Sequence, residues 1–265
     1  MPAMATPRLS VAAFGALVVA SIGAFFVTQH LKVTTPLING APRPVPAVID
    51  PLHGVRCGKY NSGFATISFW LQHRSDDVDV YVVDDASGAI VRTVASARHM
   101  RVGVRTPDGV FHWDGRLADG RVAPDGTYYF RVALRQQGAT IDLTSVPVRV
   151  KTVPPRPVIT GVQPSVISPG THVTIRYVGN ENRGGTILLY RLAATGAPRL
   201  VKVFPTPWKG QHAVWDGTVA QQQPAPAGTY LLALQVSDAA CNIGRYPAQI
   251  PSAPGSAATD VVIVR

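Results

Sequence analysis

Residues 113–128 read WDGRLADGRVAPDGTY, and residues 215–230 read WDGTVAQQQPAPAGTY. Both stretches begin with Trp-Asp-Gly and end with Pro-x-Gly-Thr-Tyr, so two motifs recur together at one shared offset. A repeat of roughly 100 residues is too long for a solenoid unit and has the size of a whole domain. The sequence therefore predicts two sibling domains.

Each copy contains short runs rich in β-branched and aromatic residues at the spacing of a β-sandwich. The strands predicted for the first copy are 45–49, 64–71, 78–84, 89–94, 110–113, 127–135 and 141–150. Those predicted for the second are 158–162, 172–178, 186–192, 200–204, 212–215, 229–236 and 259–264. Neither copy shows an apolar stripe of helical period that is long enough for a packed helix. The expected fold is all-β, with two tandem immunoglobulin-like β-sandwiches.

Both motifs have a structural explanation. A Trp that ends the fifth strand can fill the core, and Asp-Gly reverses the chain because Gly accepts positive φ and Asp bonds to nearby amides. The Tyr that closes each motif has the position of a tyrosine corner. The residues expected to serve as scaffold are Trp113, Asp114, Gly115, Tyr128, Trp215, Asp216, Gly217 and Tyr230.

The composition agrees with a β-rich chain. The 265 residues include 24 glycines and 23 prolines, which disfavour a helical protein. Lys and Arg number 25 against 15 Asp and Glu. Many of the arginines, such as Arg131, Arg149 and Arg176, sit singly in strand-like stretches, which is typical of a solvated strand face. The basic balance alone therefore predicts no specific nucleic-acid partner.

The N-terminal region contains an uncharged run, Leu9–Thr28, that matches the roughly 20 residues needed to cross a bilayer core. It predicts a cytoplasmic segment at 1–8, one transmembrane helix at 9–28, and a cell-membrane protein whose bulk lies outside the cytoplasm. A cleaved signal peptide is the alternative, because Ser21-Ile22-Gly23 fits a small-x-small cleavage site. Apolar residues continue beyond that site, which favours the uncleaved anchor.

Two Pro-rich segments delimit the expected domains. Residues 29–46 predict an extended stalk, since prolines favour polyproline geometry. Residues 153–157 read VPPRP, a linker short enough to be stiff and to stack the domains end to end. The first domain is then expected at 47–152 and the second at 158–265.

The stretch from Trp113 to Tyr128 resembles the WDG-x(n)-DG-x(3)-P-x-G-x-Y signature of bacterial FlgD-type immunoglobulin-like domains, and the second stretch resembles a degenerate copy. From about residue 40 onward the chain is similar to tandem domains of this family behind a membrane anchor in actinobacterial envelope proteins. The resemblance implies fold more than function. Family members often carry an acidic loop that resembles a calcium site, but residues 50–59 (DPLHGVRCGK) hold one carboxylate, which argues against calcium here.

The two cysteines, Cys57 and Cys241, lie in different domains. Cys57 falls in the first connection of domain one, and Cys241 follows the sixth strand of domain two. Both connections face the junction when immunoglobulin-type sandwiches stack in tandem, so a disulfide across the joint is predicted. It would stabilise by about 5 kcal/mol in the chain-entropy model and would lock the interdomain angle. Two unrelated thiols, or a bridge between chains, are the alternatives.

No catalytic, cofactor-binding or metal site is predicted. The sequence lacks a nucleophile elbow, a phosphate loop and a dinucleotide fingerprint. His53 with Cys57 makes only two zinc ligands. A glycosidase needs two carboxylates facing one cleft, whereas strand ends and turns explain the acidic cluster more simply; its members are Asp76, Asp77, Asp79, Asp84 and Asp85. A non-enzyme without a cofactor is expected, and an enzyme with a site between the domains is the alternative.

The first copy has about six extra residues between Val94 and Trp113. Arg98, Arg101 and Arg105 lie close to this inserted connection and predict a site for an anionic polymer or lipid head group. A solvated loop is the alternative.

These features together predict a non-enzymatic, membrane-anchored extracytoplasmic scaffold or adhesion protein. Its sheet edges and loops would meet another envelope protein or a cell-wall polymer. The alternative is a carbohydrate- or cell-wall-polymer-binding accessory module of a secreted hydrolase system. An exposed Trp208 would favour that alternative, and a buried Trp208 would weaken it.

Overall fold

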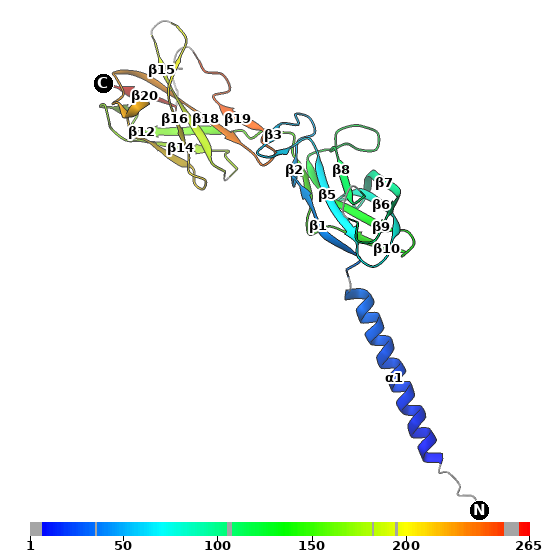
Figure 1. The fold of residues 1–265 in the computed structure, drawn as a ribbon. Helices are drawn as coiled ribbons and strands as arrows, with labels where there is room; N and C mark the ends of the chain where they lie inside the picture. The colour runs from blue at the N-terminus through cyan, green and yellow to red at the C-terminus, as the bar shows by residue number, and fades with distance from the viewer. Residues whose placement is uncertain (1–6, 35, 105–107, 182, 194–195, 252–259) are drawn as a thin grey trace, which may run out of the picture.

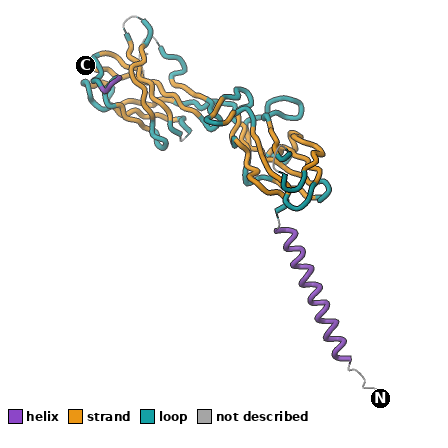
Figure 2. The backbone as a smooth tube through the Cα atoms, viewed as in Figure 1, coloured by secondary structure: helices purple, strands orange, loops and turns teal. Residues whose placement is uncertain are grey.

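The computed structural model describes residues 7–34, 36–104, 108–181, 183–193, 196–251 and 260–265. A long helix, α1 (Pro7–Thr34), precedes two β-rich bodies that lie end to end, with the C-terminus in the second (Figure 1). Strands joined by loops and turns make up both bodies (Figure 2). The all-β class predicted for the chain after the helix is confirmed.

The first body is a sandwich of two sheets. The smaller sheet has the order β1–β5–β8, and the larger has the order β2–β11–β9–β6–β7, with β10 beside β9. Strands β2 and β11 pair in parallel. The bounds are β1 (Ile38–Val45), β2 (Val48–Ile49), β5 (Ala65–Leu71), β6 (Asp76–Asp84), β7 (Ile90–Met100), β8 (Val110–Trp113), β9 (Gly126–Leu134), β10 (Ala139–Asp142) and β11 (Val148–Val150).

The second body repeats this strand order position for position. Its smaller sheet has the order β12–β14–β17, and its larger sheet has the order β13–β20–β18–β15–β16, with β19 beside β18. A 3-10 turn, η1 (Ala220–Gln222), follows β17. The bounds are β12 (Val158–Gln163), β13 (Val166–Ile167), β14 (Val173–Val178), β15 (Gly185–Leu192), β16 (Arg199–Pro205), β17 (His212–Trp215), β18 (Gly228–Ser237), β19 (Ile243–Tyr246) and β20 (Val261–Val264).

The core of each sandwich lies between its two sheets. In β5 and β14 alternate residues are buried, as expected where one face of a strand packs inward and the other does not. The largest fully buried side chains come from both sandwiches and include Trp113, Trp215, Tyr128, Tyr177 and Tyr230.

One connection has an added hairpin in the first sandwich and none in the second. The chain between β2 and β5 forms an added hairpin of β3 (Arg56–Cys57) and β4 (Tyr60–Asn61). The equivalent connection of the second sandwich is short, because residues 168–172 lead directly from β13 to β14.

The predicted extended stalk at 29–46 differs from the structure over both halves, because α1 continues to Thr34 and β1 occupies Ile38–Val45 and pairs with β5. Prolines are tolerated there because β1 is an edge strand, and an edge strand can leave N–H positions unpaired. The register shifts between Ala41 and Val45, so the stretch that holds Pro42 and Pro44 leaves the regular ladder.

Several strand ends also differ from the prediction. β7 runs on to Met100, through the region interpreted as an inserted loop, and register shifts in its pairing with β6 absorb the extra length. The predicted strand 141–150 is divided into β10 and β11. The sequence does not predict β19, whose Ile-Gly-Arg-Tyr pattern is too short for an alternation signal.

The predicted membrane anchor is wrong. Among the residues that the structure describes, no helix combines the length and the apolar character needed to cross a bilayer. A helix inserts into a bilayer because its side chains are apolar, and absence of charge alone is not sufficient. Half of residues 13–26 are Ala, Gly or Ser, which contribute little to the free energy of transfer into a bilayer. The single-pass cell-membrane location predicted from the run at 9–28 is therefore withdrawn.

Candidate functional site

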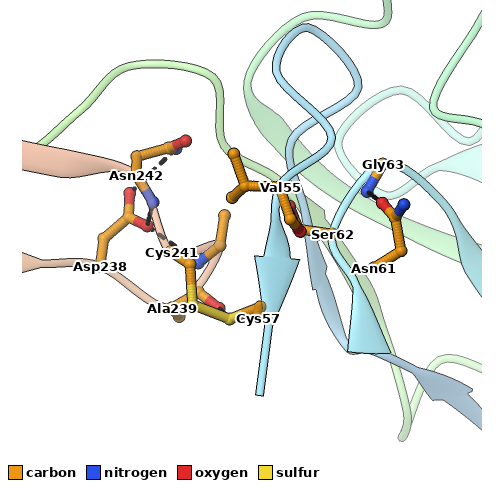
Figure 3. The surroundings of a disulfide bond; sticks show 10 residues. Val55, Cys57, Asn61, Ser62, Gly63, Asp238, Ala239, Cys241 and Asn242 are labelled. Carbon is orange, nitrogen blue, oxygen red and sulfur yellow. Dashed lines mark hydrogen bonds between the residues drawn. A yellow bond between two sulfur atoms is a disulfide. The ribbon is translucent and has the colours of Figure 1, made fainter. Parts of the chain in front are cut away.

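The joint between the two sandwiches is the candidate site, and a disulfide crosses it. Cys57 at the end of β3 is bonded to Cys241, which lies in the turn between β18 and β19 (Figure 3). The two Cα atoms are 5.6 Å apart, within the usual range for a disulfide. The pairing predicted from the sequence is thus present.

The turn that carries Cys241 is held by a buried carboxylate. Asp238 accepts hydrogen bonds from the backbone N–H groups of Ala240 and Asn242, both at 2.9 Å. It also accepts one from the side-chain amide of Asn242 at 3.2 Å (Figure 3). These bonds fix the turn in which Cys241 takes a left-handed conformation, with φ 66°.

Polar contacts add a second tie across the joint. The ammonium of Lys151, just after β11 of the first sandwich, forms ion pairs with Glu181 and, at 3.6 Å, with Asp238 of the second. The side-chain amide of Asn242 donates to the Lys151 carbonyl oxygen at 2.9 Å. Lys151 is therefore bonded to the second sandwich through both its side chain and its backbone.

The linker itself is packed into the joint. Pro155 and Pro157 are buried, although proline-rich linkers are often solvated. A Cβ atom at Gly244 of β19 would collide with the carbonyl oxygen of Pro155, and one at Gly179 would collide with that of Arg156. The second sandwich thus offers glycines where the linker passes, and the contact is too close for any side chain.

A cleft of about 500 Å³ opens at this joint. Both sandwiches line it, the first with Asp125, Arg149 and Lys151 and the second with Glu181 and Arg183. Charged groups of both signs face the cleft, so its chemistry is that of a binding surface for a polar ligand.

The repeated motifs serve as scaffold in both sandwiches. The indole N–H of Trp113 donates to the Arg116 carbonyl oxygen at 2.9 Å, and that of Trp215 donates to the Thr218 carbonyl oxygen at 2.7 Å. The Asp114 and Asp216 carboxylates each accept a backbone N–H two residues on, at 3.1 Å. Gly115 and Gly217 both have φ 69°.

The tyrosines of the motifs form the corners that the sequence predicts. The hydroxyl of Tyr128 donates to the Pro124 carbonyl oxygen at 2.9 Å, and that of Tyr230 donates to Pro226 at 2.7 Å. Each ring packs on the tryptophan of its own motif, with centroids 5.1 and 5.6 Å apart. Burial raises the pKa of both phenols, so both remain protonated donors.

Comparison with known families agrees with this geometry. Residues 60–138 match the family model of the FlgD Ig-like domain. They contain the first Trp-Asp-Gly turn and its tyrosine corner. Residues 60–138 are an FlgD-type Ig-like domain. The second sandwich lies outside that match.

The FlgD-type domain also has a curated relative. The basal-body rod modification protein FlgD of Escherichia coli (strain K12) is 33% identical over 104 residues, which cover 39% of this chain and 41% of the relative. This chain therefore spans less than half of that protein's length.

Solved structures resemble the chain only weakly. Dimeric latent PorU from Porphyromonas gingivalis is 14% identical, with 78% of this chain and 19% of that chain covered and a TM-score of 0.30. A marsupial T cell receptor is 11% identical, with 86% and 72% covered and a TM-score of 0.39. Scores this low carry no argument.

The basic segment at the end of β7 and just after it has internal partners. Arg98 donates to the Val110 carbonyl oxygen at 3.3 Å and lies 5.0 Å from the centre of the Phe111 ring. Arg101 is 3.9 Å from the Asp108 carboxylate. Arg105 lies outside the described residues. Binding of an anionic ligand by these arginines stays a prediction.

The acidic cluster lies along β6 and in the turn that follows it, and Asp79 is inside the strand and not at its end. Asp76 accepts the backbone N–H groups of Gln136 and Gln137, and Asp84 accepts that of Ser87. Asp79 accepts two hydrogen bonds from the Arg135 guanidinium, at 2.7 and 2.8 Å. These bonds lower the pKa of the Asp79 carboxyl to about 2, although burial opposes the shift.

The loop interpreted as a degenerate calcium site uses its carboxylate internally. Asp50 is buried and accepts the backbone N–H groups of Leu52 and His53, at 2.8 and 3.2 Å. Its second oxygen lies 2.6 Å from the His53 ring nitrogen. Within the described residues no group of three or more His, Cys, Asp or Glu side chains is placed to hold a metal ion.

Sequence reasoning missed most of the polar residues at the joint. Lys151, Glu181, Arg183 and Asn242 give no motif, because they meet only when the two sandwiches stack. One usable signal exists, since Glu181 is the sole glutamate of the chain and lies just after a strand of the second copy.

Proposed function

We propose that this chain is a non-enzymatic structural protein, a stiff two-sandwich spacer that holds its sheet edges and loops at a fixed mutual angle. The family match supports a structural module, and the joint supports the stiffness. The observation that carries the proposal is the Cys57–Cys241 disulfide, which ties the first sandwich to the second independently of the linker. If the two sandwiches were joined only by a flexible tether, neither the disulfide nor the contacts around it would be needed.

The stiffness can be tested by measuring a distance distribution. Fluorophores attached through unnatural amino acids at Ala86 and Ala197, both exposed, would report the separation of the two sandwiches. We expect one narrow distribution in the wild type and a broader one in Cys57→Ser/Cys241→Ser. A broad wild-type distribution would contradict a fixed angle.

A partner of the spacer would bind at a sheet edge, because edge strands leave unpaired N–H and C=O groups. The long edge strand of the larger sheet is β7 in the first sandwich and β16 in the second, since the opposite edge strands, β2 and β13, are only two residues long. A loop covers β7, with the Ala118 N–H donating to the Val91 carbonyl oxygen at 2.9 Å. On β16, Leu200 and Val203 are exposed. We therefore assign the adhesive edge to β16.

A photo-crosslinking residue at Val203 would test that assignment in cells that express the full chain. We expect crosslinked adducts from position 203 and few from Ile90, which is similarly exposed on the covered edge β7. Equal yields at both positions would argue against a specific edge.

A second candidate function, carbohydrate binding, has one observation in its favour. Trp208 is 72% exposed, as a platform for a sugar ring would be. Trp208→Ala should abolish retention on a polysaccharide column if the ring binds sugar, while Trp70→Phe, a change away from that loop, should not. Retention that survives Trp208→Ala would exclude Trp208 as the platform.

A further inference from the structure

Three cavities on the first sandwich are contiguous and form one groove. The joint cleft of about 500 Å³ shares Val48, Thr127 and Arg149 with a neighbouring cavity of about 580 Å³. That cavity shares Arg43 with a third, of about 390 Å³, which reaches the β3–β4 hairpin. The groove therefore runs from the second sandwich, across the joint and along the first sandwich, and ends at the hairpin that carries Cys57.

Positive charge dominates this groove. The cationic lining residues are Arg43, Lys59, Arg149, Lys151 and Arg183, and the acidic ones are Asp125 and Glu181. Both carboxylates are engaged within the protein. Asp125 accepts the backbone N–H and the hydroxyl of Thr152, at 2.8 and 2.7 Å, and Glu181 pairs with Lys151.

The arginines of the groove are not engaged in the same way. Within the described part of the chain, the guanidinium groups of Arg43, Arg149 and Arg183 form no hydrogen bond or ion pair with another side chain, although the Arg183 carbonyl oxygen accepts from the Asn180 amide at 3.1 Å. Arg43 and Arg149 are exposed. A guanidinium presents a planar set of donors that matches carboxylate and phosphate groups, so these three are spaced sites for anions along one path.

The remaining lining residues suit a polyhydroxylated chain. Asn61, Thr66, Ser68, Thr127 and Ser145 contribute hydroxyl or amide groups. Partly exposed aromatic rings, Tyr60 and Phe64, stand at one end of the groove. Trp208 packs beside Gly184, the residue that follows Arg183, and is not among the residues that line the three cavities. The middle of the groove has no aromatic side chain among its described lining residues, so it lacks the successive stacking platforms that single-stranded nucleic acids use.

We propose that the groove binds a linear acidic polysaccharide, whose repeated carboxylate or phosphate groups pair with Arg43, Arg149 and Arg183. The sugar hydroxyls bond to the polar lining, and a ring face packs on Tyr60 or Phe64 at the end of the groove. The proposal rests on the proposed function in one respect, because the groove is continuous only while the joint angle is held.

The test uses the full chain at low ionic strength, with hexagalacturonate as the carboxylate probe and a glycerol-phosphate hexamer as the phosphate probe. We expect calorimetry to detect binding of hexagalacturonate and none of a neutral dextran hexamer; binding of the glycerol-phosphate hexamer alone, which has no sugar ring, would overturn a polysaccharide in favour of a ring-free phosphate polymer. Arg43→Gln/Arg149→Gln should weaken binding by about tenfold or more, because each substitution removes a charge-assisted hydrogen bond. The matched control Arg176→Gln/Arg199→Gln removes two exposed arginines outside the groove and should leave affinity unchanged.

The outcomes of this experiment distinguish a failure of the groove proposal from a failure of the proposed spacer function. Absence of binding by both probes, or equal weakening in the control variant, overturns the groove and leaves the rigid joint intact. Tighter binding of a dT12 oligonucleotide that depends on Arg43 and Arg149 also overturns it, in favour of nucleic acid. Cys57→Ser/Cys241→Ser should weaken the longer probes more than a galacturonate dimer; equal weakening of both would overturn the claim that the ligand spans the joint.

Discussion

The two sandwiches share their strand order and their Trp-Asp-Gly and tyrosine contacts, yet they contribute opposite parts to the joint. The first adds the β3–β4 hairpin that carries Cys57, where the second crosses directly at residues 168–172. The second supplies the turn with Cys241, at the position of the β9–β10 turn of the first. The repeated framework is therefore kept, and the connections hold what is specific to each copy.

The comparison extends to a single position beside the linker. In the first sandwich Ala139 of β10 pairs with Leu134, and in the second Gly244 of β19 pairs with Val236, the equivalent residue of β18. The difference has a local cause, because the linker passes over Gly244 and leaves no room for a Cβ atom. In the sequence Gly244 looks like an interruption of a strand, but in the structure it is the point where the linker between the domains packs against β19.

Removal of the disulfide should cause the largest loss of stability in this pair of sandwiches. In the chain-entropy model, Cys57→Ser/Cys241→Ser costs up to about 5 kcal/mol. We expect the single unfolding transition to divide into two, because the remaining joint contacts are polar and partly exposed. Denaturant unfolding followed by hydrogen exchange of peptides from each sandwich would measure this.

Reductant provides the control for that experiment. It should convert the wild type to the behaviour of the double serine variant and leave the variant unchanged. A variant with the wild-type midpoint would show that the disulfide contributes little to the stability of the joint.

Substitution of the core tryptophans should cause the next largest loss of stability, and the loss should be equal in the two sandwiches. Trp113→Ala and Trp215→Ala each remove a fully buried ring, which costs about 3–5 kcal/mol. Each variant should lose exchange protection first in its own sandwich. Trp208→Ala, at an exposed position, should stay within about 0.5 kcal/mol of the wild type. Equal and simultaneous loss of protection in both sandwiches from one variant would mean that the tryptophan does not act first on its own sandwich.

A smaller effect is expected where the linker crosses β19. Gly244→Ala gives the second sandwich the residue that the first has at this position, and it should destabilise by about 1–3 kcal/mol because the linker must move. Ala139→Gly is the reciprocal control and should cost about 0.5–1 kcal/mol, mainly through backbone entropy, because its methyl group is only partly buried against the core. Thermal unfolding of both variants measures the difference, and equal costs would mean that the linker is not tightly packed.

The parts of the molecule that local patterns determine could be predicted from the sequence. The Trp113 and Trp215 turns, both tyrosine corners and most strands follow from motifs and alternation. The Cys57–Cys241 bond could also be predicted, because topology places both connections at one junction. The groove could not, since Arg43, Arg149 and Arg183 belong to separate segments and Arg149 alone reads as a residue of a solvated strand face. The sequence does not predict β1 because its prolines are unfavourable in most strands. The run at 9–28 was predicted to cross a membrane because it has no charge, but it is not apolar enough to do so.

The smallest predicted effect is a pH dependence confined to the first sandwich. Asp79 is bonded to Arg135, whereas the equivalent position of β15 is Thr186, which cannot form such a pair. The pKa of Asp79 is about 2 in the folded protein, against 3.8 for an unperturbed Asp carboxyl, so the pair stabilises the fold above pH 3.8. That stability is lost as pH falls from about 4 toward 2, because the unfolded chain then binds the proton more readily.

The substitution Asp79→Asn should lower the melting temperature of the first sandwich by about 3 °C at pH 7. The gap between this variant and the wild type should close as pH falls to 2, since the wild-type carboxyl is then increasingly protonated. Asp85→Asn, which changes a nearby exposed carboxylate, is the control and should show no such convergence. The second sandwich should melt alike in all three proteins, and a gap that persists at pH 2 would mean that Asp79 acts through packing instead of charge.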